Sequence, residues 1–159
     1  MNSLTARRSP RTLTVAAAAL VVVASLTAPT ANAQPAPNPE PTWSGLDTRE
    51  WNLPVPSPGV AAATVPLDPA LSLPQAGRAV RQAYGTVDQH GRTAIATSAV
   101  FLPHGTPPPG GWPVVAWAHG TTGLGDDCAP STQPRSERDA DYLGHWLDRG
   151  YAVVAADYV

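Results

Sequence analysis

The sequence predicts an α/β fold that consists of a β-hairpin followed by one β-α-β unit. Residues 79–102 contain two runs rich in β-branched and aromatic residues, and the turn sequence Asp88-Gln89-His90-Gly91 separates them as in a hairpin. Residues 114–156 contain two short apolar runs with an amphipathic segment between them. Two buried strands connected through a helix form a parallel pair, with a right-handed crossover in nearly all known cases. We therefore expect a mixed sheet with its antiparallel strands at one edge.

The first 33 residues have the composition of a secretory signal peptide. Three arginines precede an apolar stretch from about residue 15 to 28, and the small residues Ala31-Asn32-Ala33 follow as a cleavage site. The stretch is shorter than the roughly 20 residues that a membrane-spanning helix needs. We expect secretion to the exterior or cell wall, a mature chain that starts at Gln34, and no transmembrane anchor after cleavage.

Net charge and amino-acid composition indicate which classes of partner are expected and what kind of genome encodes the chain. Cleavage after residue 33 leaves seven basic and twelve acidic residues, a net charge of −5, so nucleic acid is not an expected partner. All ten basic residues are arginine, and alanine, proline and glycine are abundant. This composition is typical of a GC-rich bacterial genome.

Residues 34–78 are expected to form a proline-rich arm or linker. Prolines at this density remove backbone donors and restrict φ, which excludes a helix or an interior strand and favours an extended, polyproline-like conformation. Trp43 and Trp51 lie in this arm. They are expected either to pack on the surface of the domain or to dock on a partner or polysaccharide. Order is expected to begin near Ala79, where a partial α/β domain extends over residues 79–159.

The elements after the hairpin follow from their end signals. A loop over residues 103–111 leads to a buried strand at Val114–Ala118. A helix is expected from Ser136, a suitable N-cap, to Arg149, and Gly150 ends it. Residues 151–156 form the second buried strand.

The segment W-P-V-V-A-W-A-H-G-T-T-G-L-G-D-D-C-A-P-S, residues 112–131, carries the clearest functional signal. A glycine-rich loop follows its buried strand, and α/β enzymes place their chemistry at the carboxyl ends of such strands. The residues H-G-T-T-G resemble the oxyanion loop of α/β-hydrolases. The continuation G-D-D-C-A-P-S resembles the bacterial and fungal secretory lipase family within that fold. The resemblance covers about residues 79–159 and is strongest over 112–131.

The resemblance implies carboxylic-ester hydrolysis of the lipase or esterase type, by a Ser-Asp/Glu-His triad with an oxyanion hole and no cofactor. The backbone amide of Thr121 would be the first oxyanion donor, with those of Thr122 and Gly123 as alternatives. Gly120 would let the backbone approach the substrate, and His119 would shape the loop. Cys128, the only cysteine, would form a disulfide with a downstream cysteine; otherwise it is a small buried hydrophobe.

The sequence contains no G-x-S-x-G nucleophile elbow. It therefore resembles the incomplete N-terminal part of an α/β-hydrolase sheet, and we expect it to be inactive alone, with lipids or other esters as substrates of the full-length parent. Asp157, at the end of the second parallel strand, is expected to be a structural hydrogen-bond acceptor rather than the triad acid. The rival interpretation is a secreted non-catalytic module that binds a cell-wall or lipid surface.

Two other site types fit the sequence less well. Gly123-x-Gly125 follows a strand, but Cys128, Pro130 and the acidic pair Asp126-Asp127 do not fit a dinucleotide-binding loop, and a P-loop needs a lysine, which this chain lacks. A metal site formed by His119, Asp126 and Asp127 has no known ligand spacing, so no metal is expected.

Overall fold

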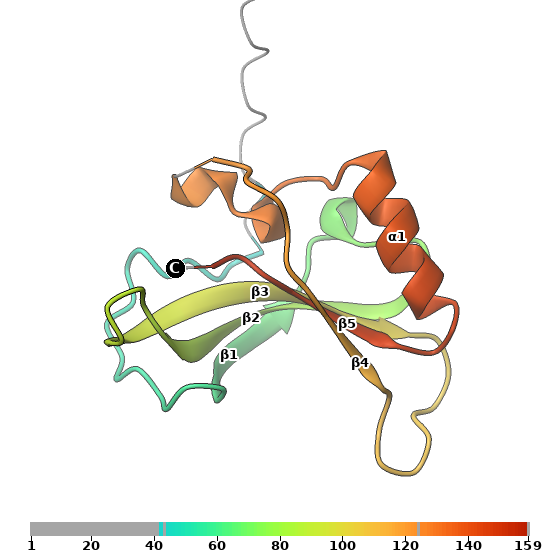
Figure 1. The fold of residues 1–159 in the computed structure, drawn as a ribbon, viewed down its shortest axis with the longest axis horizontal. Coiled ribbons are helices and arrows are strands. Elements are labelled where there is room, and N and C mark those ends of the chain that lie inside the picture. The colour runs from blue at the N-terminus through green and yellow to red at the C-terminus, as the bar shows by residue number, and fades with distance from the viewer. Residues whose placement is uncertain (1–41, 43, 124, 159) are drawn as a thin grey trace, which may run out of the picture. The chain divides into compact units, whose positions relative to one another are not determined.

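The computed structural model describes residues 42, 44–123 and 125–158, and it shows a five-stranded mixed sheet (Figure 1). The spatial order of the strands is β1-β2-β3-β5-β4. Neighbouring strands are antiparallel except for β4 and β5, which are parallel. The predicted α/β sheet, antiparallel at one side, is confirmed. The strands are β1 (Ala61–Pro66), β2 (Ala76–Val87), β3 (Thr93–Pro103), β4 (Val114–Trp117) and β5 (Ala152–Ala156), and the helical elements are η1 (Pro69–Leu71), η2 (Asp126–Cys128), η3 (Pro130–Thr132) and α1 (Glu137–Leu147).

The predicted hairpin is formed by β2 and β3, whose turn is organised by Asp88. The Asp88 carboxylate accepts from the backbone N–H groups of His90, at 2.8 Å, and Arg92, at 2.9 Å. Gly91 adopts φ +73°, a left-handed conformation that glycine reaches without steric cost. The side chain of one aspartate thus adds two hydrogen bonds to the backbone bonds of a tight turn.

The predicted β-α-β unit is formed by β4, α1 and β5. Ser136 is the N-cap of α1, as predicted, and its hydroxyl accepts from the Asp139 N–H at 3.2 Å. Gly150, at φ +77°, ends the helical segment and turns the chain into β5. The parallel register pairs Val115 with Val153.

The expectation that order begins near Ala79 is wrong. Strand β1 lies within the proline-rich region and pairs with β2, and η1 follows it. A proline is tolerated at this edge because an edge strand needs backbone donors on one side only, and Pro66 is the last residue of β1. After β1, the side chains of Leu67, Leu71 and Leu73 are buried in the core of the domain. Apolar residues between the prolines thus complete the core.

Some sequence predictions concern residues outside the described ranges or close to where those ranges begin. The signal peptide and Trp43 lie outside the described residues. Trp51 is half-buried on the domain. No helix within the described ranges is both long and apolar enough to cross a membrane.

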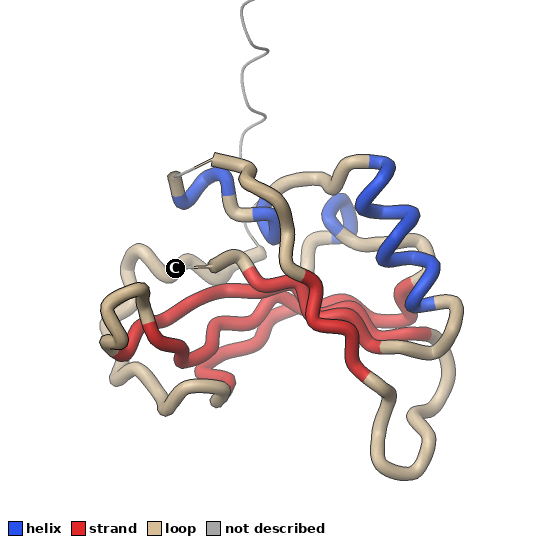
Figure 2. Tube along the Cα trace, in the orientation of Figure 1, coloured by secondary structure: helices blue, strands red, loops and turns tan. Residues whose placement is uncertain are grey.

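The helical elements all lie on one side of the sheet, where the core forms (Figure 2). Phe101, Leu143 and Val153 are completely buried there, between β3, β5 and α1. Because successive strand residues point to opposite faces, Val100 and Val154 point to the other side, where they are half-buried. The core comprises Leu67, Leu71, Leu73, Ala99, Phe101, Leu143, Leu147, Val153 and Ala155.

The two edges of the sheet differ in how well they are protected. On β1, a register irregularity between Ala61 and Ala63 and the terminal Pro66 both discourage pairing with a further strand. Strand β4 is as uncharged as β1 but has neither a proline nor a register irregularity, and its Val114 is 62% exposed. The β4 edge is therefore the more open of the two to pairing with a strand of another chain.

We predict that Leu143→Ala lowers the free energy of unfolding by about 2–5 kcal/mol, because it leaves a cavity against β5. The matched control is the neighbouring Tyr142→Ala, whose side chain is 50% exposed and whose loss should cost far less. Urea unfolding followed by tryptophan fluorescence measures both. Equal effects would show that α1 does not pack as described.

We also predict that the chain self-associates through β4, and that Ala116→Lys on this edge raises the monomer fraction. A lysine on an exposed strand edge opposes pairing with another chain. Sedimentation velocity measures the effect, and Thr64→Lys on β1 is the control. If Thr64→Lys dissociates the assembly as well as Ala116→Lys does, β4 is not the edge through which the chain associates.

Candidate functional site

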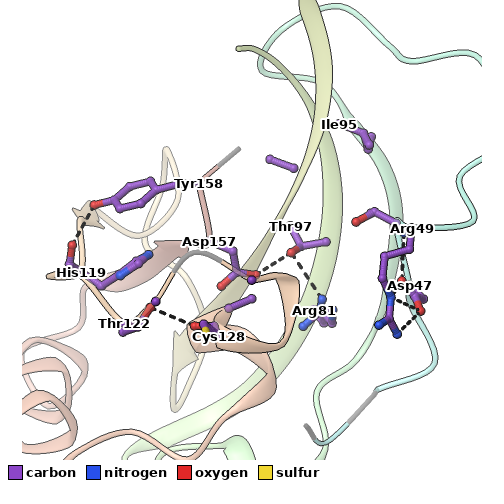
Figure 3. A pocket seen from close by; sticks show the side chains of 15 residues that line it. Asp47, Arg49, Arg81, Ile95, Thr97, His119, Thr122, Cys128, Asp157 and Tyr158 are labelled. Atoms are coloured by element: carbon purple, nitrogen blue, oxygen red, sulfur yellow. Dashed lines mark hydrogen bonds and ion pairs between the residues drawn. The ribbon is translucent and has the colours of Figure 1, made fainter. Parts of the chain in front are cut away.

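The loop after β4 and the residues after β5 meet at one edge of the sheet. Because β4 and β5 are parallel, their carboxyl ends lie side by side. The Tyr158 hydroxyl donates to the His119 carbonyl at 3.1 Å, and the two rings stack with centroids 4.2 Å apart. Tyr158 has φ +62°, a strained conformation for an aromatic residue, and these two contacts help to hold it. The predicted loop is thereby joined to the end of β5 (Figure 3).

His119 turns its ring toward its own loop. Its Nδ1 lies 2.6 Å from the Gly120 carbonyl oxygen, and because a carbonyl only accepts, Nδ1 carries the proton. Its Nε2 is buried and has no hydrogen-bond partner among residues 42, 44–123 and 125–158. The ring is thus held by Tyr158 and Gly120, and its role in shaping the loop stays a prediction.

Gly120 and Thr121 are exposed, as are the two loop residues that follow them. Within the described part of the chain, the Thr121 N–H donates to no backbone carbonyl. A Cβ on Gly120 would meet no atom within 4 Å. The loop therefore presents an available backbone donor beside open space, which is where an external acceptor can approach.

The loop folds back on Cys128. The Thr122 hydroxyl donates to the Cys128 carbonyl at 2.9 Å. Gly123 has φ +135°, and a Cβ at this position would overlap the Cys128 side chain, so only glycine fits. The Cys128 thiol is free and half-buried, and its predicted disulfide stays a prediction.

A largely buried polar network connects four side chains, those of Arg81, Thr97, Ser131 and Asp157. Figure 3 shows three of them, Arg81, Thr97 and Asp157. The Asp157 carboxylate accepts from the Ser131 N–H at 2.8 Å, from the Thr97 hydroxyl at 2.6 Å, and from the Ser131 hydroxyl. Arg81 donates to the Ser131 hydroxyl oxygen and, at 3.4 Å, to that of Thr97. Asp157 thus acts as a structural acceptor, as the sequence predicted.

Arg81 is the charged residue that the sequence reading missed. Its side chain is only 2% exposed, and its Nε donates to the Leu46 carbonyl at 3.1 Å. Burial lowers the pKa of Arg81, and the charges of Asp157 and Asp47 oppose that shift. The available signal was its position in the predicted strand, since Arg81 shares one face with the small apolar residues Ala79 and Ala83.

Two clefts open on either side of the loop, with volumes of about 430 and 320 Å³. His119, Thr122 and Cys128 line both of them. Arg81, Thr97 and Asp157 of the polar network line the first cleft, and Gly120 and Thr121 line the second. We call them the network cleft and the loop cleft.

The structure gives no support to a metal site. Within the described residues, no three His, Cys, Asp or Glu side chains come together as metal ligands would. Asp127 instead forms an ion pair with Arg49 at 3.4 Å, on the exposed surface. Asp126 lies in η2.

Comparisons with known proteins assign no family to this chain. The chain matches no protein-family model, no curated protein and no solved structure. What the arrangement offers chemically is a backbone donor on a braced loop, next to a partly apolar cleft and near the half-buried carboxylate of Asp157.

We predict that Asp157→Ala destabilises the domain by about 3–5 kcal/mol, because it removes the negative charge that does most to offset the burial of the Arg81 guanidinium, and with it the acceptor of Thr97 and Ser131. Asp148→Ala, at the exposed C-cap of α1, removes an equal charge and should change the unfolding free energy by less than about 0.5 kcal/mol. Chemical denaturation measures the unfolding free energy of both variants. Similar midpoints for the two variants would mean that the network does not stabilise the fold.

Proposed function

We propose that residues 119–123 form the oxyanion loop of a secreted carboxylic-ester hydrolase of the lipase or esterase type. The observation that carries this proposal is that the N–H groups of residues 120–123 donate to no backbone carbonyl of the described residues. Thr121 lies among them, after the carboxyl end of β4, and lines the loop cleft. The resemblance of H-G-T-T-G and G-D-D-C-A-P-S to the secretory lipase family supports the same role.

The chemistry explains why a braced loop matters. Acyl transfer builds negative charge on a carbonyl oxygen, and a donor fixed in advance stabilises that charge without having to reorganise, at about 2.7–4 kcal/mol per donor. Here the loop is braced at both ends, by the Thr122 hydroxyl on Cys128 and by Tyr158 on His119. Thr121 lies between these two braces.

The strand order agrees with the proposed role. Strand β5 lies between β3 and β4, so β4 has one free edge in the described sheet. In the α/β-hydrolase arrangement the strand that carries the nucleophile pairs with this edge. A serine on such a strand would reach the same end of the sheet as Thr121.

The walls of the loop cleft suit an ester with an apolar portion. Trp117, Pro130 and Pro134 contribute apolar surface, while Gly120 and Thr121 supply backbone groups. Apolar walls with a few placed donors are the usual composition of a small-molecule site. We therefore propose lipids or other carboxylic esters as substrates, met after export of the protein.

The 159 residues contain no G-x-S-x-G elbow, so the proposal needs a nucleophile from another segment. We predict that the purified chain hydrolyses no p-nitrophenyl butyrate in a fluorophosphonate-sensitive manner. We also expect the DNA after codon 159 to encode a G-x-S-x-G elbow in frame. An immediate stop codon, together with a stable monomeric chain, would favour the non-catalytic binding module instead.

If that elbow is encoded, the longer product permits a direct test of the loop. Thr121→Pro removes the backbone donor and should lower kcat by about 10²–10³-fold, whereas Thr121→Ser keeps the N–H and should remain close to the parent. Gly120 is compatible with a following proline. Equal kcat values for the two variants would exclude Thr121 as the oxyanion donor.

A further inference from the structure

Arg135 occupies an unusual position at the wall of the loop cleft. It lies in the connection between η3 and α1, next to Ser136. Its guanidinium carbon is 5.2 Å from the ring centroid of Phe101 and 5.2 Å from that of Trp117. Two aromatic residues, from β3 and β4, thus hold one cation at the opening of the cleft.

The hydrogen-bonding capacity of Arg135 is not used within the described residues. Its Nε and Nη1 are buried there and donate to no acceptor. No carboxylate of the described residues forms an ion pair with it, since the ion pairs found involve Arg49, Arg92 and Arg138. Burial lowers the pKa of Arg135, and the charges of Asp157 and Asp139 oppose that shift from a distance. A guanidinium in this state gains most from an external anion.

The free-energy cost of burying the Arg135 guanidinium favours the binding of an anion. Taking a cation out of water is costly unless hydrogen bonds and an opposite charge replace the lost hydration. The faces of Phe101 and Trp117 offset part of that cost through cation–π attraction. They supply no acceptor for the N–H groups, so an anion that does so would complete the site.

We propose that Arg135 binds the carboxylate of an aliphatic acid in the loop cleft. A carboxylate matches the planar fork of a guanidinium, and the apolar walls at Trp117, Pro130 and Pro134 accommodate an alkyl chain. Asp127 and Asp139 line the same cleft. Their negative charges oppose any anion, and they oppose a doubly charged phosphate more than a singly charged carboxylate.

This inference is independent of the proposed hydrolysis, because carboxylate binding needs no nucleophile. It also gives the loop cleft a second polar contact besides Thr121. An acid released from an ester carries the group that Arg135 would recognise. A failed esterase assay therefore leaves this proposal intact, and the binding experiment decides it alone.

The test is a titration of the purified chain with sodium octanoate, by calorimetry and by tryptophan fluorescence, since Trp117 lies beside Arg135. We expect saturable binding of octanoate and at least tenfold weaker binding of octanamide, which has the same chain length but no charge. Arg135→Gln should weaken octanoate binding at least tenfold. Arg149→Gln removes an exposed arginine that lines neither cleft and should leave the affinity unchanged.

Several results would overturn the proposal. These are no octanoate binding by the parent chain, octanamide binding as tight as that of octanoate, or equal losses in Arg135→Gln and Arg149→Gln. Displacement of octanoate by inorganic phosphate at equal concentration would show a general anion site instead. If Arg135→Gln does not fold, Arg135→Lys keeps the charge but not the fork and should bind octanoate more weakly. The comparison with octanamide needs no variant at all.

Discussion

The carboxylate of Asp157 is the contact on which the arrangement of this edge of the sheet depends. It accepts from the Ser131 N–H and the Thr97 hydroxyl, and through the hydroxyls of Thr97 and Ser131 it reaches the buried Arg81. These residues come from β2, β3, η3 and the end of β5. A buried guanidinium is tolerated only where its charge and donors are compensated. The network therefore fixes η3 on the sheet more specifically than apolar packing would.

The positions of Thr121 and Arg135, the two residues proposed to bind ligand, depend on the position of η3. The chain on one side of η3 is the loop that carries Thr121, and the chain on the other side carries Arg135 into α1. Both residues line the loop cleft, so a shift of η3 would move both of its walls. The braces at Thr122 and Tyr158 then limit how far the loop itself can move. Preorganisation of this kind is what an oxyanion donor requires.

Local patterns predicted the elements, whereas the polar contacts depended on tertiary packing. The hairpin, the N-cap at Ser136 and the parallel pair β4 and β5 were predictable because turn residues, caps and apolar runs act over a few positions. Strand β1 was missed because prolines surround it, although an edge position tolerates them. Arg81 and Arg135 were missed as site residues because their surroundings come from strands distant in sequence. An arginine on the apolar face of a predicted strand was the one available clue.

The hydrogen exchange of the Ser131 amide tests the central claim most directly, because this N–H donates to Asp157 and reports whether η3 is fixed. If Asp157 holds η3 on the sheet, the Ser131 amide exchanges as slowly as the amides of β3 and β5, measured by NMR on the labelled chain. Gly105, in the exposed loop after β3, provides the fast reference. Exchange of Ser131 at the rate of Gly105 would contradict the account, because the loop cleft would then have no fixed wall.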